Sequence, residues 1–287
     1  MLSFFCIPKA FRGHIGLIQR NAIQSWMRIP GCEVILFGDD DGTAEAAKEF
    51  RLRHVTGVQR NSAGTPLVSD LFARAEQAAS GEMLCYVNAD IILLDDFLPA
   101  VERVASRFSS FLMIGQRWNL DLTEGMDFAG DWQRALRSQV DAEAKLHPPT
   151  GLDYFVFRRG LWPRIPPFAI GRCAWDEWLV YAARSSRVPV VDLTPATTVV
   201  HQNHDYSHHP QGAEGVWKGE EARQNLALAG GYRHAATLRD ATHVLRPGGV
   251  HSRLIPYDLK RCLVLPLTTH PLARSWIRML KFHTGGE

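Results

Sequence analysis

The chain has 287 residues, 46% of them hydrophobic, so it has enough apolar material for one large domain or two modest ones and is not expected to be disordered. Its 32 basic and 30 acidic residues give a net charge of +2, which excludes the broad positive field on which nonspecific nucleic-acid binding depends. Five widely spaced cysteines in apolar surroundings favour reduced thiols in a cytoplasmic protein. We expect no signal peptide and no membrane span, because no basic leader precedes the N-terminal apolar run and no stretch reaches roughly 18 apolar residues.

The first half of the chain alternates between strand-like and helix-like patterns. Strands are predicted at 2–8, 33–37, 54–58 and through "MLCYVNADIILL" (83–94), and helices at 15–27, 43–50, from Pro66 to about Gly81, and 95–108. Strands separated by helices of this length predict βαβ units and a mostly parallel, doubly wound sheet. Ligands of such sheets bind at the carboxyl ends of the strands, where "GDDDG" and "NAD" both fall.

The second half is less regular. Strands are predicted in "FLMIGQRWNLDL", "GLDYFVFRRGLW" and "VPVVDLTPATTVV", a helix in "AWDEWLVYAARSS", and a histidine-rich loop in "HQNHDYSHH". Beyond residue 210 the segments are short, and no repeat or low-complexity linker separates them from the rest. We therefore predict one α/β domain over residues 1–210 and an irregular C-terminal extension, 211–287, packed on the same domain.

The order of these motifs over residues 1–205 resembles the GT-A glycosyltransferases, particularly the family-2-like nucleotide-sugar transferases. The resemblance implies a Rossmann-like GT-A fold whose mostly parallel central sheet is flanked by helices. In that family an Asp-x-Asp motif ends the fourth strand and holds a divalent cation against the donor's diphosphate. Here the matching segment is Asn88-Ala89-Asp90, so the first aspartate is replaced and Asp90 is the implied ligand of Mn²⁺ or Mg²⁺.

The chemistry of the side chains, apart from any resemblance, also favours a cation-binding role for Asn88 and Asp90. Residues i and i+2 of a strand point the same way, so the amide of Asn88 and the carboxylate of Asp90 can address one ligand. A hard divalent ion prefers such oxygen atoms and would neutralise the phosphates that leave during sugar transfer. The alternative is that Asp90 caps the next helix or binds backbone amides at the strand end.

Four further residues are predicted to contact the nucleotide donor. In the resembling family an acidic residue after the second strand hydrogen-bonds the base or ribose, and Asp39 and Asp40 are the matching positions. Arg60, in "RNSAGTP", is suited to pair with phosphate, and Asp70 lies one turn into the next helix, within reach of a sugar. The alternative is that these Asp and Gly clusters only form turns and helix caps.

The helix of "AWDEW" carries the predicted catalytic residue. The family's general base lies in an acidic pair at the start of such a helix, and Asp176 is the closest match. In an inverting mechanism, the leading hypothesis, Asp176 deprotonates the acceptor hydroxyl, whereas in a retaining mechanism it would only bind the acceptor. Trp175 and Glu177 on either side of it, and Asp153 in "GLDYF", are predicted to contact substrate. The alternative is that Asp176 and Glu177 only interact favourably with the helix dipole.

The histidine-rich loop supplies candidate metal ligands. Many GT-A enzymes add a late histidine to the metal site; His201, directly after an apolar strand, is the first candidate and His204 the second. His208 and His209 follow on chain that has left the sheet. A zinc site formed by the histidines alone and a solvated loop are the alternatives.

The leading hypothesis is a metal-dependent glycosyltransferase that uses a nucleotide-diphosphate sugar and a glycan or lipid-linked acceptor. A nucleotidyltransferase, a zinc hydrolase built on residues 201–209, and a non-catalytic sugar-binding module remain alternatives. The C-terminal "LKRCLVLPLTTHPLARSWIRMLKF" mixes basic and apolar residues. This segment is predicted either to pack on the sheet or to rest peripherally on the inner face of a membrane.

Overall fold

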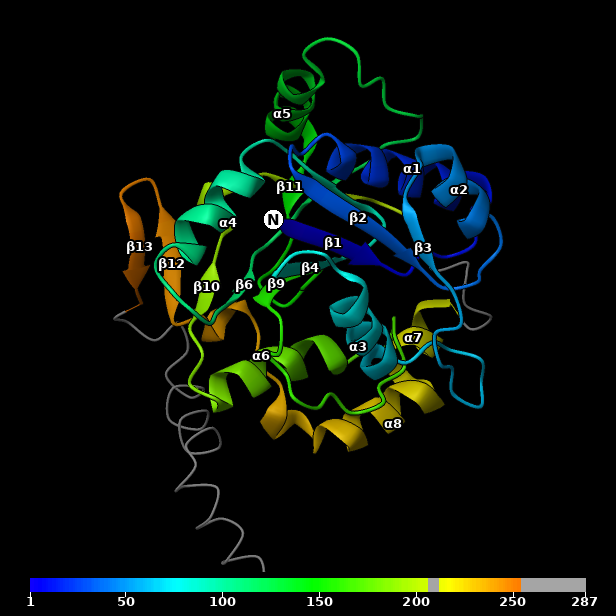
Figure 1. The fold of residues 1–287 in the computed structure, drawn as a ribbon, viewed down its shortest axis with the longest axis vertical. Coiled ribbons are helices and arrows are strands. Elements are labelled where there is room, and N and C mark those ends of the chain that lie inside the picture. The colour runs from blue at the N-terminus through cyan, green and yellow to red at the C-terminus, as the bar shows by residue number, and fades with distance from the viewer. Residues whose placement is uncertain (206–211, 254–287) are drawn as a thin grey trace, which may run out of the picture.

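The computed structural model describes residues 1–205 and 212–253. Within these ranges a nine-stranded sheet forms the centre of the molecule (Figure 1). Its strands are β1 (Leu2–Cys6), β2 (Cys32–Phe37), β3 (Arg53–Val55), β4 (Met83–Val87), β6 (Leu112–Ile114), β9 (Tyr154–Arg158), β10 (Val190–Asp192), β12 (His243–Arg246) and β13 (Gly249–Ser252). They lie in the order β13-β12-β10-β6-β9-β4-β1-β2-β3.

Most neighbouring strands of this sheet run parallel. β1 lies parallel to β2 and β4, β3 is parallel to β2, and β10 is parallel to β6 and β12. β9 runs antiparallel between β4 and β6, and β13 is antiparallel to β12. The predicted α/β class with a mostly parallel central sheet is therefore confirmed.

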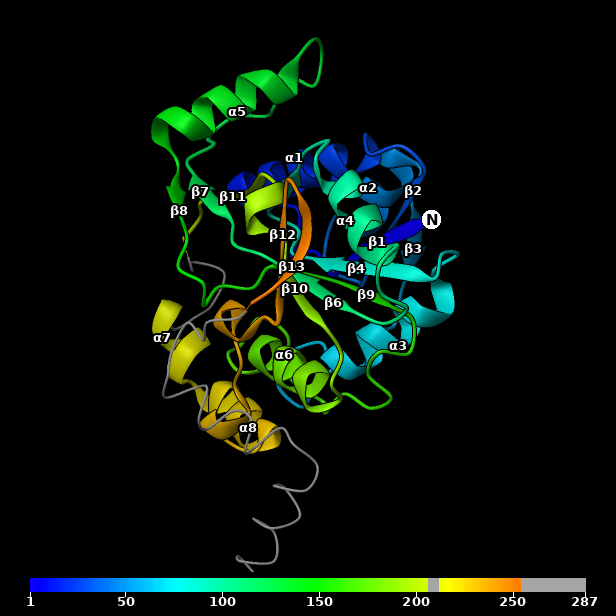
Figure 2. The same cartoon turned by 90° about the vertical axis from the view of Figure 1, so that its left-hand side faces the viewer.

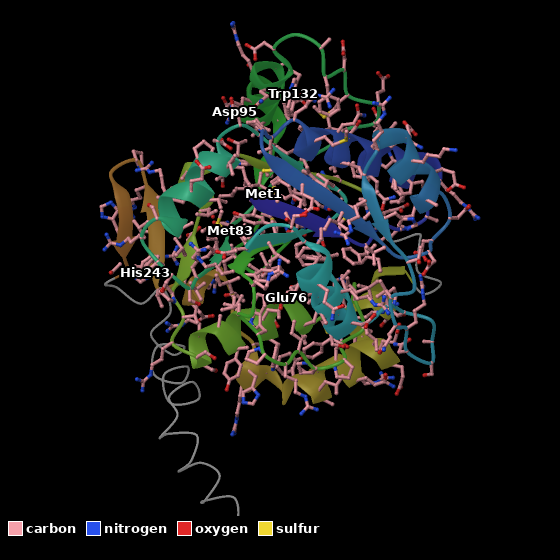
Figure 3. The ribbon with its side chains drawn as sticks, in the orientation of Figure 1. Met1, Glu76, Met83, Asp95, Trp132 and His243 are labelled. Carbon is pink, nitrogen blue, oxygen red and sulfur yellow. The ribbon has the colours of Figure 1, made fainter. Side chains whose placement is uncertain are left out.

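Helices cover both faces of the sheet. On one face lie α1 (Gly13–Met27), α2 (Thr43–Phe50) and α4 (Phe97–Ala105), and on the other α3 (Val68–Ala78) and α6 (Trp175–Ser185) (Figure 1). Neighbouring side chains of β1 point to opposite faces, so Phe4 packs against Trp26 while Phe5 packs against Phe72. Such side chains fill the space between the sheet and its helices (Figure 3). Both faces of β1 are buried, which is why four of its five residues are apolar, and the exception, Ser3, donates a hydrogen bond to Glu33.

A smaller sheet adjoins the central one (Figure 2). It consists of β5 (Ile91–Leu93), β7 (Trp118–Leu120), β8 (Lys145–Leu146) and β11 (Val199–Gln202), in the order β5-β11-β7-β8. Helix α5 (Trp132–Glu143) packs on it, and Trp132 and Asp95 lie close together at this end of the molecule (Figure 3). Pairing of β11 with β5 sets His201 opposite Ile91, so the histidine-rich segment returns to the end of β4.

The described part of the C-terminal extension is largely regular. It contains α7 (Gly212–Lys218), α8 (Glu220–Ala229) and the hairpin of β12 and β13. Helix α8 packs beside α6, and β12 joins the central sheet next to β10 (Figures 1 and 2). No described helix combines the length and the apolar character needed to cross a lipid bilayer. The segment "LKRCLVLPLTTHPLARSWIRMLKF" lies outside the described residues.

Two predicted elements differ from the structure. The single strand expected over residues 83–94 is two strands, because the chain turns at 88–90 and β5 pairs in the smaller sheet. Pro66 is not in the first turn of α3, which begins at Val68. Leu67 is extended and pairs with Ala169, and hydrogen bonds on either side of this pair join Pro66 to Ile170 and Val68 to Phe168. This contact between distant parts of the chain is not contained in the local pattern.

Candidate metal centre and active site

Three polar segments meet at one edge of the central sheet. Lys9 follows β1, Asp39 follows β2, and Asn88 to Asp90 follow β4. These strands are adjacent and parallel, so their carboxyl ends lie side by side. This edge is where ligands bind in open α/β sheets.

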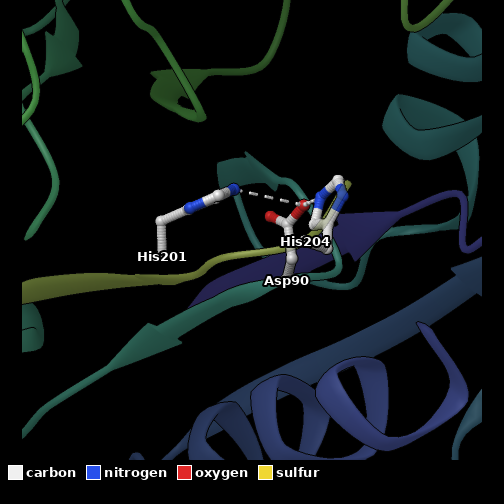
Figure 4. A group of neighbouring side chains, drawn as sticks. All are labelled: Asp90, His201 and His204. Carbon is white, nitrogen blue, oxygen red and sulfur yellow. Dashed lines mark hydrogen bonds and ion pairs between the residues drawn. The ribbon is translucent and has the colours of Figure 1, made fainter. Parts of the chain in front are cut away.

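Asp90 lies between His201 and His204, which come more than a hundred residues later in the chain (Figure 4). Its Oδ2 is 3.1 Å from Nε2 of His204 and 3.8 Å from Nε2 of His201. One ligand atom from each residue lies within 4.8 Å of the others. That spacing approaches the roughly 3–4.5 Å expected between atoms that each lie about 2.0–2.3 Å from one cation. All three side chains are partly sheltered, with exposed fractions of 10–17%.

The polar atoms of this group are incompletely satisfied. Among the described residues, Oδ1 of Asp90 and Nδ1 of His201 are buried and have no hydrogen-bond partner. Nδ1 of His204 lies 2.7 Å from the carbonyl oxygen of Asp205, to which an N–H would donate. In that tautomer the lone pair of Nε2 faces Asp90, so either a second proton or a cation is needed between them. A buried carboxylate with two imidazoles is a donor set that fits a divalent cation.

Burial and charge act on Asp90 in opposite directions. Burial alone would raise the pKa of the Asp90 carboxyl. The positive charges of His201, His204 and Lys9 and the hydrogen bond from His204 outweigh this effect, so the pKa is lowered. Asp90 is therefore held as a carboxylate, the form that binds a cation.

Buried amides fix the backbone around this group. Gln202, between the two histidines, is fully buried; its Nε2 donates to the carbonyl oxygens of Ile18 (2.8 Å) and Asp90 (3.2 Å). Its Oε1 accepts from Nδ2 of Asn21, which is 2.9 Å away on α1. The side chain of Gln19 bonds both the N–H and the carbonyl of Lys9. The chain segments that carry Lys9, Asp90 and the histidines are thus all tied to α1.

The side chain of Asn88 forms its hydrogen bonds with residues other than Asp90. Because β4 ends at Val87, Asn88 and Asp90 lie in a turn, and the reasoning from strand geometry that would aim both at one ligand is wrong. The amide of Asn88 accepts from the hydroxyl of Tyr86 (2.8 Å) and donates to Oδ1 of Asp153 (2.9 Å). Asp153 is buried and also pairs with Arg117. Asn88 and Asp153 therefore belong to a network beside the metal group.

The residues predicted for the nucleotide lie near the ends of β2 and β3. Asp39 accepts from the N–H of Gly57 (2.9 Å), and Asp40 pairs with Arg60 (2.7 Å). Asp70 accepts from the N–H of Gln59 (2.8 Å) and pairs with Arg74. These contacts shape the chain at 57–60, as the turn and cap alternative expects. Asp39 and Arg60 are nevertheless exposed, so their side chains can also contact a ligand.

Asp176 lies in the first turn of α6, half-buried. Burial raises the pKa of its carboxyl to about 7, and the charge of Glu177 adds to the shift. Trp175 is 5% exposed and packs against Tyr86 and Phe155, so most of its ring is in the core instead of open to a sugar. Glu177 is half-buried, and its carbonyl oxygen accepts from Ala236.

Three residues near this edge were missed by the sequence reasoning. These are Lys9, Arg117 and Arg172. Burial lowers the pKa of Lys9; the negative charge of Asp90 opposes this shift, and the positive charge of Arg172 adds to it. Lys9 and Arg172 therefore lie in the same electrostatic neighbourhood as Asp90. Arg117 pairs with Asp153. Lys9 comes shortly after the end of β1, a parallel strand, so the strand-end rule could have indicated it. Arg117 and Arg172 stand in irregular segments that gave no such signal.

No protein-family model and no curated protein sequence matches this chain. Among solved structures it is similar to residues 1–349 of S. aureus TarS in complex with UDP-GlcNAc, at 13% identity and a TM-score of 0.49 over 72% of this chain and 60% of that one. It is also similar to M. tuberculosis glucosyl-3-phosphoglycerate synthase in complex with Mn²⁺, UDP and phosphoglyceric acid, at 17% identity and a TM-score of 0.49 over 79% and 76%. The Mg²⁺ and UDP complex of that synthase matches at 16% identity and a TM-score of 0.47 over 91% and 92%.

The chain spans 60% of the TarS fragment. At this level of identity and structural agreement, the likeness concerns the arrangement of the chain and carries no argument about its activity.

Proposed function

We propose that this protein is a metal-dependent glycosyltransferase that moves a sugar from a nucleotide-diphosphate donor to an acceptor hydroxyl. The observation that carries the proposal is the group of Asp90, His201 and His204, with two buried unsatisfied polar atoms, at the ligand-binding edge of a mostly parallel sheet. The order of sequence motifs supports the same activity.

Each part of the site has a role in this proposal. Asp90, His201 and His204 hold Mn²⁺ or Mg²⁺, and a cation there would neutralise the diphosphate that leaves. Lys9 lies in the same electrostatic neighbourhood and would add positive charge near the phosphates. Asp39, Asp40, Arg60 and Asp70 stand near the ends of β2 and β3 for contact with the nucleoside.

Asp176 is the proposed general base. A base works best when its pKa is near the working pH, and burial raises the pKa of Asp176 to about 7. Ionised Asp176 would accept the proton of the acceptor hydroxyl as its oxygen attacks the anomeric carbon, which inverts the configuration there. The nature of the acceptor, a glycan or a lipid-linked sugar, stays a prediction. So do a cytoplasmic location and peripheral contact of the segment "LKRCLVLPLTTHPLARSWIRMLKF" with the inner face of a membrane.

A zinc hydrolase is the second candidate, because two histidines and one carboxylate are also a common set of ligands for catalytic zinc. The two candidates differ in what they bind. A hydrolase needs tightly held zinc and no nucleotide. A transferase needs a cation that binds together with a nucleotide diphosphate.

Calorimetry with nucleotide diphosphates and Mn²⁺, Mg²⁺ or Zn²⁺ tests the proposal. We expect a nucleoside diphosphate to bind at least tenfold more tightly with Mn²⁺ than with Mg²⁺, because imidazole nitrogen suits transition metals better than Mg²⁺. Asp90→Asn should abolish the Mn²⁺-dependent part of binding, whereas Asp141→Asn, at an exposed position of α5, should not change it. Stoichiometric zinc that no nucleotide affects would favour the hydrolase, and unchanged binding in Asp90→Asn would remove Asp90 from the site.

A further inference from the structure

Helix α8 binds the backbone of the loop that precedes α6. The side chain of Asn225 is 1% exposed, and its Oδ1 accepts from the N–H of Ala169 (2.8 Å). Its Nδ2 donates to the carbonyl oxygens of Ala169 (2.9 Å) and Cys173 (3.1 Å). Both donors and the acceptor of this amide are therefore used on one short stretch of main chain.

The same stretch is held from its other side by the start of α3. The N–H of Val68 donates to the carbonyl of Phe168 (2.9 Å), and the N–H of Ile170 donates to that of Pro66 (3.0 Å). The N–H and carbonyl of Ala169 consequently point away from α3, toward α8. Asn225 takes the place that a neighbouring strand would have there.

A second contact links α8 to two loops through one carboxylate. Oε2 of Glu221 accepts from Nε (2.9 Å) and Nη2 (2.7 Å) of Arg172, and the two side chains are 14% and 12% exposed. Oε1 of Glu221 accepts from Nδ2 of Asn61 (2.7 Å). Asn61 in turn accepts from the N–H groups of Ala63 and Thr65, so it shapes the loop beside Arg60.

The loop that these contacts hold ends in a residue with a strained backbone. Gly171 has a φ of 68° and Ala174 a φ of 78°, and Ala174 is the residue that caps α6. A non-glycine residue in this left-handed region costs roughly 1–2 kcal/mol and persists only where its surroundings hold it. The first two residues after that cap are Trp175 and Asp176.

We propose that α8 is a positioning element of the active site: Asn225 and Glu221 hold residues 169–174 in the conformation that starts α6, and thereby fix Asp176. The role of Asp176 rests on the proposed function, whereas the hold of α8 on the loop does not. Asn225 and Glu221 act through the backbone and through Arg172, so they are positioning residues. The C-terminal extension then contributes to catalysis without touching the substrate.

Hydrogen exchange of the full chain tests the hold directly. Glu221→Gln keeps the size of the side chain but removes its charge, and we expect the amides of residues 170–178 to exchange about tenfold faster. Those of α4, on the opposite face of the sheet, should not change. The matched control is Glu220→Gln, because Glu220 is exposed and pairs with Arg223 on the same helix. Equal protection of residues 170–178 in the two variants, or faster exchange throughout the protein, would show that α8 does not fix the conformation of this loop.

Asn225→Ala is the stronger variant, since it leaves three backbone groups without their partner, and thermal unfolding must show that it still folds. If it does not, Glu221→Gln alone decides. Steady-state sugar transfer then tests positioning: Glu221→Gln should lower kcat at least tenfold, while KM for the donor and Mn²⁺-nucleotide affinity change less than about twofold. Faster local exchange with an unchanged kcat would reject positioning. A parent protein that turns over no nucleotide sugar would reject the proposed function, and the exchange comparison would still decide whether α8 holds the loop.

Discussion

The surroundings of two carboxyl groups in the site shift their pKa values in opposite directions. Burial raises the pKa of Asp176 to about 7, and Glu177 adds a like charge. Burial also acts on Asp90, but two histidines and Lys9 outweigh it and lower the pKa. One group can therefore exchange a proton near neutral pH while the other stays ionised, which is how one site assigns different roles to the same chemical group.

The general base is tested by Asp176→Asn, which keeps the size of the side chain and removes its basicity. We expect kcat to fall by roughly 10² to 10⁴, with nucleotide and Mn²⁺ affinity retained. In the parent, kcat should rise with pH through about 7 as Asp176 ionises, and this rise should be absent from the variant. Glu177→Gln should cost much less. A parent-like rate in Asp176→Asn, or a dead Glu177→Gln, would place the base elsewhere.

The same group makes a prediction for stability. Because the folded pKa of Asp176 is raised above its ordinary value of 3.8, the folded state binds the proton more tightly than the unfolded state does. The free energy of unfolding should therefore fall as pH rises from about 4 to about 7, and Asp176→Asn should flatten that part of the curve. Urea unfolding across this range measures it, and an identical slope in both proteins would contradict it.

At the scale of elements, contact between α1 and β11 assembles the metal group. Gln202 of β11 is fully buried, and its amide joins Asn21 and Ile18 of α1 to the carbonyl of Asp90. β11 and β4 lie more than a hundred residues apart in the chain, so no local preference brings His201 and His204 to Asp90. Buried polar side chains with complete partners determine this arrangement.

Replacing Gln202 with leucine should therefore affect both stability and the metal. We expect a loss of about 1–3 kcal/mol in the free energy of unfolding, because Asn21 loses its acceptor and Ile18 its donor. Mn²⁺ affinity should fall by about 10- to 100-fold, as for other residues that orient metal ligands. Gln77→Leu, at an exposed position of α3, should change neither. A variant that is less stable but binds Mn²⁺ like the parent would limit Gln202 to packing.

At the scale of the whole molecule, the described extension is continuous with the core. β12 pairs with β10 in the central sheet, and Ala229, Leu238 and Leu245 are buried in the main clusters. The 287-residue chain should therefore unfold in one cooperative transition, with coincident changes in tryptophan fluorescence and circular dichroism. Residues 1–210 alone should not fold stably, because the edge of β10 and the apolar surface of α6 would be exposed. Two separate transitions, or a folded fragment, would show instead that the extension is a separate unit.

The sequence determined the class of the fold and predicted the residues of the candidate metal group. Alternation of apolar strands with amphipathic helices is a local pattern, and it predicted the mostly parallel sheet, α2 and the boundaries of α6 almost to the residue. Motif order indicated Asp90, His201 and His204, because residue type and position at a strand end are also local properties.

Tertiary structure alone decided how those residues meet. Asn88 donates a hydrogen bond to Asp153, the carbonyl of Pro66 accepts one from the N–H of Ile170, and Trp175 packs in the core. Each of these contacts depends on a partner that is distant in the sequence. Lys9 and Arg172 come together with Asp90 only through the meeting of three chain segments. The physical reason is that buried polar groups must find hydrogen-bond partners wherever the packed chain supplies them, and a one-dimensional pattern does not contain those distances.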